Sequence, residues 1–516
     1  MSQADIRESA SVAHIYGQNL VAGESFTAPG GEGKSYAYHP ANIKPIADME
    51  LYSGLNRFVV HTSVHQPVDD RRPGLGLGPI GQWFNRLDCW TESAWAWVDY
   101  LSRSSYMLQQ GHYVADIVYY YGEDNNIAGM FGNELPPVPS GYSFDFINSD
   151  ALLNLLKVSR TGNLTTPSGM RYRMLVLDDN AKKMTIPVLR KIAELAKGGA
   201  IICGAKPEKP AGLTDDPAEF EQLVKEIWES GKSNVYTDKS MLEVLKDNSI
   251  KPDVALPEGS GLRFVHRTTS AAEIYWVNNP DTTQAKTVDL TFRVKGKKPE
   301  VWHPETGKKE DVSYTINGDN TTTVTLNLVE GDALFVVFGS KADANEVKLP
   351  DLKESTLLTV TTPWTVTFQE NRGAPAEAVT FDQLIDLSNA EDPGVKYFSG
   401  EATYKTTIDV PAIEEGSKLT LDLGNVGVMA EVTVNGNNLG LYWKKPFVID
   451  VTDAISTGSN EIEVKVTNLW INRLIGDSRP DMTEKVTWSQ YPMYRPTSQM
   501  SPSGLMGPVR LISKNR

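Results

Sequence analysis

Residues 4–25, ADIRESASVAHIYGQNLVAGES, read as a helix that leads into a strand. Apolar residues recur at Ile6, Ala10 and Ala13, which is the spacing of one helix face, and Gly17 follows as a stop signal. Residues 19–23 then have the apolar character of a short buried strand. We therefore expect the chain to begin inside a helix–strand unit, with no strand before the first helix.

This helix–strand pattern recurs twice before the chain reaches residue 121. Residues 43–56 favour a helix before the strand 58–60, and residues 91–110 favour a long aromatic helix before the strand 113–120. Alternating helices and strands imply a parallel sheet. Repeats of about 35–45 residues with long loops suit a (β/α)8 barrel, which needs eight strands and about 250 residues. We therefore expect residues 1–140 to form the C-terminal part of such a barrel.

Residues 141–258 carry a second α/β pattern, in which Gly198 and Gly199 end one of the helices. The expected strands are 173–177, 200–204 and 234–236, and the expected helices are 182–197, 216–229 and 240–246. Short strands alternating with helices predict a small doubly wound domain.

From residue 262 onward the apolar residues alternate with a period of two, which indicates β-strands. We expect a β-sandwich over residues 259–345 and a jelly-roll-like β-sandwich over residues 350–516. The segment 348–359 reads as the linker between them, and Asn435–Gly436 is a hairpin turn signal. The expected fold class is therefore multidomain, α/β followed by all-β.

Charge and hydropathy exclude several classes of partner. The 516 residues carry 65 Asp and Glu against 50 Lys and Arg, a net charge of −15. Such a surface repels phosphate backbones, which argues against nucleic acid as the main partner. No apolar run approaches the ~18 residues of a membrane span, and no secretory signal is visible at the N-terminus. Cys89 and Cys203 fit small buried side chains rather than a disulfide framework.

Candidate functional residues follow the predicted barrel strands, because the working residues of a (β/α)8 barrel lie at the C-terminal strand ends. Glu24 follows the first predicted strand, and His61 ends the second, with His65 four residues later. Tyr121 and Glu123 follow the third predicted strand. The same regions add Trp83, Trp90, Glu92 and Asp124.

A strand-end glutamate among histidine and aromatic residues fits glycosidic bond hydrolysis. That reaction uses one carboxyl group as an acid and a second as a base or nucleophile, and aromatic rings offer flat apolar surfaces to pyranose faces. Each candidate also has a structural reading. Glu24 fits a salt-bridged or solvated group, His61 a core histidine, His65 a loop residue, and Glu123 with Asp124 a pair of turn carboxylates.

Two other catalytic chemistries find no support in the sequence. His61 and His65 have a spacing seen in zinc sites, but HTSVH lies at a strand end and lacks the glutamate of HExxH. No GxSxG motif supports a Ser-His-Asp nucleophile.

Aromatic residues of the last block offer a binding activity instead. Together with the predicted hairpin, Trp443, Phe447 and Trp470 resemble the aromatics of a carbohydrate-binding jelly roll. The alternative is that the aromatics of this block are sandwich core, which we expect for Trp364 and Phe447.

Several long stretches of the chain are shared with one enzyme family. They are ADIRESASVAHIYGQNLVAGESFT, HTSVHQP, SAWAWVDYLSRSSYMLQQGHYVADIVYYYGEDN, YSFDFINSDALLN, KYFSGEATY, NLWINRLIGD and SGLMGPV. Spread over nearly the whole chain, they resemble the C-terminal portion of a bacterial α-L-rhamnosidase of glycoside hydrolase family 106.

The resemblance implies a calcium-assisted, inverting hydrolase that acts on rhamnose-containing oligo- or polysaccharides. It implies a barrel, a flavodoxin-like domain and β-sandwiches. Glu24 matches the glutamate that serves as the family's general base. His61, His65 and Trp90, with Tyr121 and Glu123, fall in matching motifs as substrate-contacting positions. The resemblance assigns no calcium ligands.

The chain departs from the family in its length, because a complete member is roughly twice as long and carries the general acid in the first part of its barrel. We therefore expect an N-terminally truncated product, weakly active or inactive alone, whose complete parent is periplasmic or extracellular. Two alternatives stay open: a non-catalytic carbohydrate-binding protein and a β-galactosidase-like hydrolase.

Overall fold

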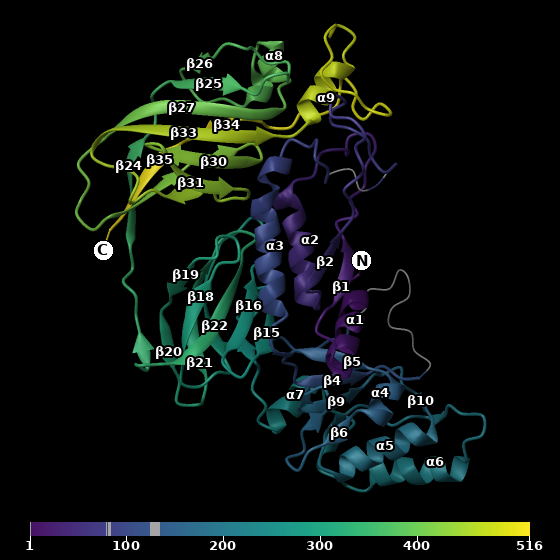
Figure 1. The fold of residues 1–516 in the computed structure, drawn as a ribbon. Coiled ribbons are helices and arrows are strands. Elements are labelled where there is room, and N and C mark those ends of the chain that lie inside the picture. The colour runs from purple at the N-terminus through teal and green to yellow at the C-terminus, as the bar shows by residue number, and fades with distance from the viewer. Residues whose placement is uncertain (1, 79, 81–83, 124–134, 516) are drawn as a thin grey trace. The chain divides into compact units, whose positions relative to one another are not determined.

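The computed structural model describes residues 2–78, 80, 84–123 and 135–515 (Figure 1). These residues divide into two compact units. The first unit comprises residues 1–23, 48–59 and 101–349, and the second comprises residues 24–47, 60–100 and 350–516. Residues 1–140, predicted as one domain, thus contribute to both units.

The predicted N-terminal helix is present as α1 (Gln3–Tyr16). Ser2 and Asp5 form a capping box at its start, where the side chain of each satisfies a backbone N–H of the other. Gly17 ends the helix with φ +79°, a left-handed conformation that glycine adopts without steric cost. The stop signal read from the sequence is therefore confirmed.

The strands β1 (Ala22–Ser25) and β2 (Arg57–Val60) form a small sheet. The N–H of Asn56 donates to the carbonyl of Val21, and the N–H of His61 donates to the carbonyl of Ser25. Because both partners advance in the same direction, the two strands are parallel and end at the same edge. The helices of this region are α2 (Pro40–Ser53), the 3-10 turn Thr91–Ser93 and α3 (Ala94–Leu108).

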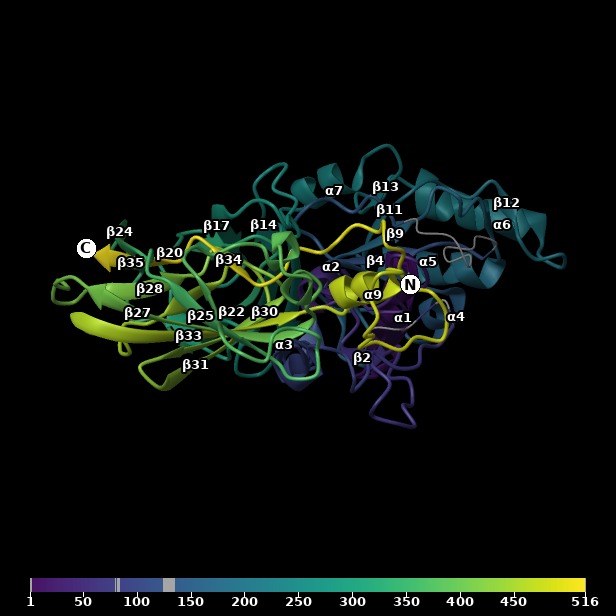
Figure 2. The same ribbon diagram turned by 90° about the horizontal axis from the view of Figure 1, so that it is seen from above.

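The first unit contains a parallel sheet with the strand order β13-β11-β9-β4-β5. Its strands are β4 (Ile117–Tyr120), β5 (Phe144–Ile147), β9 (Met174–Leu177), β11 (Ile201–Cys203) and β13 (Val235–Tyr236). Its helices are α4 (Ser149–Asn154), α5 (Ile186–Lys197), α6 (Pro217–Val224) and α7 (Met241–Asp247). Helices α5 and α6 pack together beside this sheet (Figures 1 and 2). The expected α/β pattern of this segment is present.

The prediction that residues 113–120 form a third barrel strand is wrong. β3 (His112–Tyr113) pairs with β15 (Arg263–Thr268), and β4 lies between β9 and β5 in the parallel sheet. Every residue of β4 is buried. A strand buried on both faces has the same apolar sequence in a barrel and in a doubly wound sheet, so the pattern alone could not separate the two.

The two largest remaining sheets of the first unit are antiparallel. One sheet has the order β19-β18-β22-β16-β15-β3 and a second has the order β14-β17-β21-β20-β23. The strands are β14 (Val254–Ala255), β16 (Glu273–Asn278), β17 (Lys286–Phe292), β18 (Lys297–Trp302), β19 (Lys309–Asp311), β20 (Tyr314–Ile316), β21 (Thr322–Leu328), β22 (Ala333–Lys341) and β23 (Glu346–Val347). Tyr275, Phe292 and Phe338 of their common core pack with ring centroids 4.8–5.9 Å apart.

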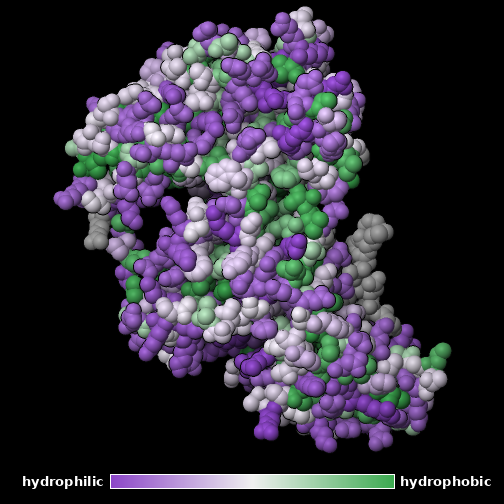
Figure 3. Space-filling model, viewed as in Figure 1, coloured by the Kyte–Doolittle hydropathy of each residue, from purple (hydrophilic) through white to green (hydrophobic). Residues whose placement is uncertain are grey.

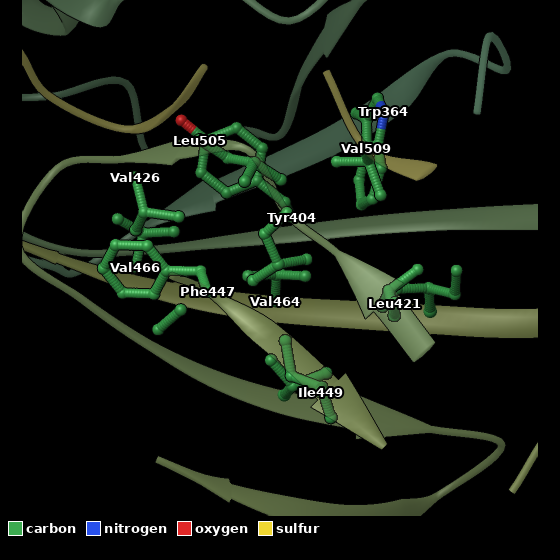
Figure 4. Close-up of a cluster of buried hydrophobic side chains, with 14 of the residues drawn as sticks. Trp364, Tyr404, Leu421, Val426, Phe447, Ile449, Val464, Val466, Leu505 and Val509 are labelled. Atoms are coloured by element: carbon green, nitrogen blue, oxygen red, sulfur yellow. The ribbon is translucent and has the colours of Figure 1, made fainter. Parts of the chain in front are cut away.

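The second unit also builds its core from antiparallel sheets, with the orders β26-β25-β27-β33-β30-β31 and β24-β35-β28-β32. The strands are β24 (Lys353–Thr359), β25 (Trp364–Phe368), β26 (Val379–Phe381), β27 (Gly400–Val410), β28 (Lys418–Asp422), β30 (Met429–Val434), β31 (Asn437–Tyr442), β32 (Val448–Asp450), β33 (Gly458–Asn468) and β35 (Arg510–Asn515). Trp364 and Phe447 point into this core, as predicted (Figure 4). The short helices α8 (Pro393–Lys396) and α9 (Ile471–Ser478) lie outside the sheets.

Two sequence signals in the second unit have opposite outcomes. Asn435 and Gly436 have φ +51° and +79° and join β30 to β31, so the hairpin turn is confirmed. The predicted linker 348–359 is corrected, because its second half is β24, which pairs with β35. Its polar residues stand at the edge of a sheet, where alternation is weak. Within the described ranges no helix is long and apolar enough to cross a membrane.

Candidate functional site

Glu24 lies near the C-terminal end of β1, with an exposed side chain. The hydroxyl of Thr27 donates a hydrogen bond to its Oε1 at 2.6 Å. The chain turns sharply after the strand, where Phe26 has φ +67° and buries its ring against Trp97 at 5.9 Å. The buried ring fixes the strand end, while the Glu24 carboxylate stays accessible to water.

His61 is the first residue after β2, at the edge where β1 also ends. Its side chain is half-buried, and within the described ranges its buried Nδ1 has no hydrogen-bond partner. A buried ring nitrogen without a partner is costly, and a bound ligand or water would satisfy it. His65 is exposed on the loop that follows. The structure therefore brings Glu24 and His61 to one strand edge.

Sequence reasoning missed Gln66, which organises this loop from a buried position. Its Nε2 donates to the carbonyl of Leu75 at 2.8 Å, and its Oε1 accepts from the Leu75 N–H at 2.7 Å. Gly74 has φ +99°, and a Cβ there would overlap the Gln66 side chain. Arg86 donates to the Gln66 carbonyl at 2.7 Å. A glutamine beside a glycine-rich loop gives no distinctive sequence signal.

Trp90 is 1% exposed, so it presents no ring face to solvent. Its indole N–H donates to the carbonyl of Tyr38 at 3.2 Å, and its ring lies 5.8 Å from that of Phe84. A role for Trp90 in binding would therefore act through the residues it supports. Trp83, one of its predicted neighbours, lies outside the described residues, and Glu92 is exposed.

Tyr121 and Glu123 belong to the first unit. Tyr121 is half-buried against Phe146, with ring centroids 6.2 Å apart, and burial raises the pKa of its hydroxyl. The Glu123 carboxylate accepts hydrogen bonds from Thr185, at 2.6 Å from the backbone N–H and 3.0 Å from the hydroxyl. Thr185 is the N-cap of α5, so Glu123 stabilises the start of that helix. Asp124 lies outside the described residues.

The two tryptophans predicted as carbohydrate-binding aromatics are buried, with 4% exposure for Trp443 and 0% for Trp470. Trp443 packs edge-on against Trp97 at 5.2 Å. The indole N–H of Trp470 donates to the carbonyl of Leu87 at 3.0 Å, and the Arg372 guanidinium lies 4.2 Å from its ring centre. Neither ring offers a flat surface to a sugar, which corrects the binding interpretation of both residues.

Metal binding finds no obvious place among the residues that the structure describes. No group of three or more His, Cys, Asp or Glu side chains in those ranges is arranged to hold a metal ion. Calcium takes six to eight oxygen ligands, largely from carboxylates and carbonyls. The described carboxylates do not form such a set, and calcium stays a prediction of the family resemblance.

Comparison with known proteins identifies the family. The model of glycoside hydrolase family 106, described as alpha-L-rhamnosidase, matches residues 1–316. The solved rhamnosidase of Novosphingobium sp. PP1Y is 42% identical with a TM-score of 0.93, and the match covers 99% of this chain and 49% of that one. A Formosa agariphila protein named "Putative beta-glucuronidase" is 26% identical over an alignment that spans 751 positions and covers 97% of this chain and 63% of that protein.

The chain thus spans about half the length of the solved rhamnosidase that it matches. The family model covers more than half of the present chain, including β1, β2 and the candidate residues around them. The chain belongs to the α-L-rhamnosidase family, glycoside hydrolase family 106.

Proposed function

We propose that the protein hydrolyses terminal α-L-rhamnosyl linkages of complex polysaccharides with inversion, and that Glu24 is the general base. The observation that carries this proposal is the family match over residues 1–316. The role of Glu24 is supported by its exposed carboxylate at the end of a parallel strand, where the Thr27 hydroxyl donates a hydrogen bond to it.

In an inverting reaction the base removes a proton from a water molecule that attacks the anomeric carbon. A carboxylic acid on the other side of the sugar protonates the departing oxygen, and the two carboxyl groups stand about 6.5–9.5 Å apart to admit the water. Glu24 would orient and deprotonate that water. His61, half-buried at the same strand edge, would accept a hydrogen bond from a substrate hydroxyl or donate one to it through the exposed part of its ring.

We place the general acid in the part of the family fold that this chain does not span, since the chain covers 49% of the solved rhamnosidase. Exposed apolar side chains on two helices offer a surface on which that part of the family fold would pack. Ile46 on α2 and Trp95 and Val98 on α3 are 42–55% exposed. Hydrophobic surface is visible where α2 and α3 lie (Figure 3). Barrel helices normally cover such side chains by packing beside their neighbours.

The other predicted site residues enter the proposal with different roles. His65 is accessible for direct contact with the glycan, whereas buried Trp90 would hold the Tyr38 backbone in place. Tyr121 and Glu123 are proposed as contacts on family motifs alone. The proposed mechanism contains no step through calcium.

The test joins this chain to the part of the Novosphingobium rhamnosidase that it does not cover. The fusion should hydrolyse an aryl α-L-rhamnoside and leave an aryl β-D-galactoside and an aryl β-D-glucuronide intact. Turnover should be absent or weak in the 516-residue chain alone, because the acid step is commonly worth ~10²–10⁴-fold. Preference for the galactoside or the glucuronide would contradict the assignment to rhamnosides.

A carbohydrate-binding protein without catalysis remains the second candidate. Turnover by the fusion that disappears in Glu24→Gln would exclude it. Binding of rhamnose-containing oligosaccharides by a fusion with no turnover on any of the three aryl glycosides would favour it.

A further inference from the structure

The second unit contains a solvent-open cavity of about 700 Å³, well within the usual ~300–1,000 Å³ of small-molecule sites. Segments far apart in the chain form its walls. Asp69, Asp70 and Arg72 come from the loop after β2, and Asn371 and Gly373 come from the turn after β25. The remaining walls are Pro393 and Gly394, Arg473 of α9, and residues 482 and 484–486.

Side chains of both charges line this cavity, and one of them, Asp69, also pairs with Arg86. Arg72, Arg473 and Lys485 supply hydrogen-bond donors, and Asp69, Asp70 and Glu484 supply acceptors. Pro393, Met482 and Val486 add apolar surface. A ligand that pairs with both signs without a net charge of its own carries many hydroxyl groups on an apolar ring. This is the chemistry of a neutral sugar residue.

Arg473 shows that the cavity is a built site. The residue is 2% exposed, and its Nη2 donates to Asp477 Oδ1 at 2.5 Å and to the carbonyl of Glu484 at 3.0 Å. Its Nε is buried and finds no hydrogen-bond acceptor among the residues that the structure describes. Gly373, with φ +80°, makes room for this guanidinium, because a Cβ there would overlap Nη1.

Asp477, the ion-pair partner of Arg473, holds the part of the wall formed by residues 484–486. Asp477 Oδ2 accepts hydrogen bonds from the backbone N–H groups of Val486 and Thr487, at 2.9 and 2.6 Å, and from the Thr487 hydroxyl at 2.7 Å. The buried Arg473–Asp477 pair therefore fixes the segment that carries Glu484 and Lys485. A wall held before the ligand arrives lowers the entropy cost of binding.

The loop that supplies Asp69, Asp70 and Arg72 begins at the strand edge where Glu24 lies. β1 and β2 are parallel, and the His61 N–H bonds the Ser25 carbonyl at 2.9 Å, so the chain leaves both strands at one edge. The cavity and Glu24 belong to the same compact unit. The loop that lines the cavity therefore starts beside the end of the strand that carries Glu24.

From these observations we infer that the cavity binds neutral sugar residues of the glycan on the leaving-group side of the scissile bond. This inference rests on the proposed function for its substrate. It assigns to Asp70, Arg72, Arg473 and Lys485 the recognition of the polysaccharide beyond its terminal rhamnose. The cavity would thereby set which glycans are cut.

The test is calorimetric titration of the 516-residue chain with three probes: L-rhamnose, a neutral rhamnose-terminated tetrasaccharide, and the trisaccharide that remains when its rhamnose is removed. Asp70 and Lys485 are exposed, so Asp70→Ala and Lys485→Ala should fold normally. Asp453→Ala and Lys418→Ala change exposed residues of the same unit away from the cavity and serve as matched controls.

The tetrasaccharide should bind at least tenfold more tightly than L-rhamnose. Asp70→Ala and Lys485→Ala should each weaken it by about three- to tenfold, and the controls should not. Equal affinity in all four variants, or no gain from the added sugars, would overturn the inference. A trisaccharide that binds in a cavity-dependent way, with no rhamnoside turnover by the fusion, would instead refute the proposed function and leave the sugar site standing.

Discussion

The backbone N–H of His61 donates to the carbonyl of Ser25 at 2.9 Å, which brings the residue after β2 level with the end of β1. This single contact places the half-buried His61 ring and the exposed Glu24 carboxylate at one strand edge. The accessible carboxylate and the unsatisfied imidazole nitrogen form the centre of the proposed hydrolytic site.

Glu24→Gln should lower kcat of the fusion protein by about 10²–10⁴-fold with little change in KM, because the amide keeps the shape and cannot accept the proton of water. The stability should hardly change, since Glu24 is exposed. Stopped assays with an aryl α-L-rhamnoside and thermal unfolding measure the two effects. Glu258→Gln, an exposed change in the other unit, is the control. A loss of less than tenfold would remove Glu24 from catalysis.

Glu123→Ala should destabilise the first unit by about 0.5–2 kcal/mol, because it removes the acceptor at the start of α5. Urea unfolding measures this loss, with Glu221→Ala, an exposed change on α6, as the control. A selective rise in KM without a loss of stability would show that Glu123 touches substrate and that its helix contact is incidental.

Gly373→Ala should impair the sugar cavity as well as stability. Alanine at φ +80° costs about 1 kcal/mol of backbone strain, and its Cβ would also displace the Arg473 guanidinium. Gly416→Ala is a matched control, since Gly416 has the same φ of +80° and open space around it. The tetrasaccharide affinity should fall only in the Gly373 variant. Equal effects of the two substitutions would mean that Arg473 does not act in the cavity.

His266 should make the stability of the first unit depend on pH. The ring is fully buried, which disfavours its charge, but Asp253 at 2.7 Å and Glu273 at 3.2 Å outweigh burial and raise its pKa. The stability it contributes is complete below the unfolded pKa of about 6.5 and is lost as the pH rises through the higher folded pKa. Tyr275 stacks on the ring, and Arg293 lies 3.5 Å from Asp253.

At acid pH the dependence is reversed, because Glu273 makes the stability fall as the pH decreases. Despite burial, the contact with His266 lowers the pKa of Glu273 to about 2, so its contribution is present above the unfolded pKa near 4.3 and disappears as the pH falls toward 2. His266→Gln should cost about 3–5 kcal/mol near pH 6 and flatten the decline above that pH. Urea unfolding across pH 2–9 measures the loss of stability at acid pH and, by comparison of the variant with the parent protein, the two effects of His266→Gln. An unchanged alkaline slope in the variant would contradict the charged state of His266.

The sequence predicted those features that local chemistry determines. The Gly17 helix end, the Asn435–Gly436 turn and the core positions of Trp364 and Phe447 depend on backbone conformation or burial that nearby residues reveal. Strand partners were less accessible. β4 has the same apolar pattern in either parallel architecture, and its true neighbours are set by long-range pairing.

For the candidate site, the sequence predicted position and not role. The strand-end positions of Glu24 and His61 are present in the structure, and their part in catalysis stays a prediction. The sequence could not reveal that Trp443 and Trp470 are buried, because aromatic side chains serve cores and sugar sites alike. The cavity beside the Arg473–Asp477 pair forms where segments far apart in the chain come together, such as those of Arg72 and Arg473. A local sequence pattern cannot predict such a long-range contact.

The most direct test of the central claim is the anomeric form of the first product released by the fusion protein from an aryl α-L-rhamnoside. Proton NMR during the first minutes of the reaction distinguishes the two anomers before they equilibrate in water. A water molecule activated by Glu24 and attacking opposite the leaving group yields β-L-rhamnose first, and Glu24→Gln should abolish its appearance. Initial release of α-L-rhamnose, or an unchanged rate in Glu24→Gln, would contradict the account.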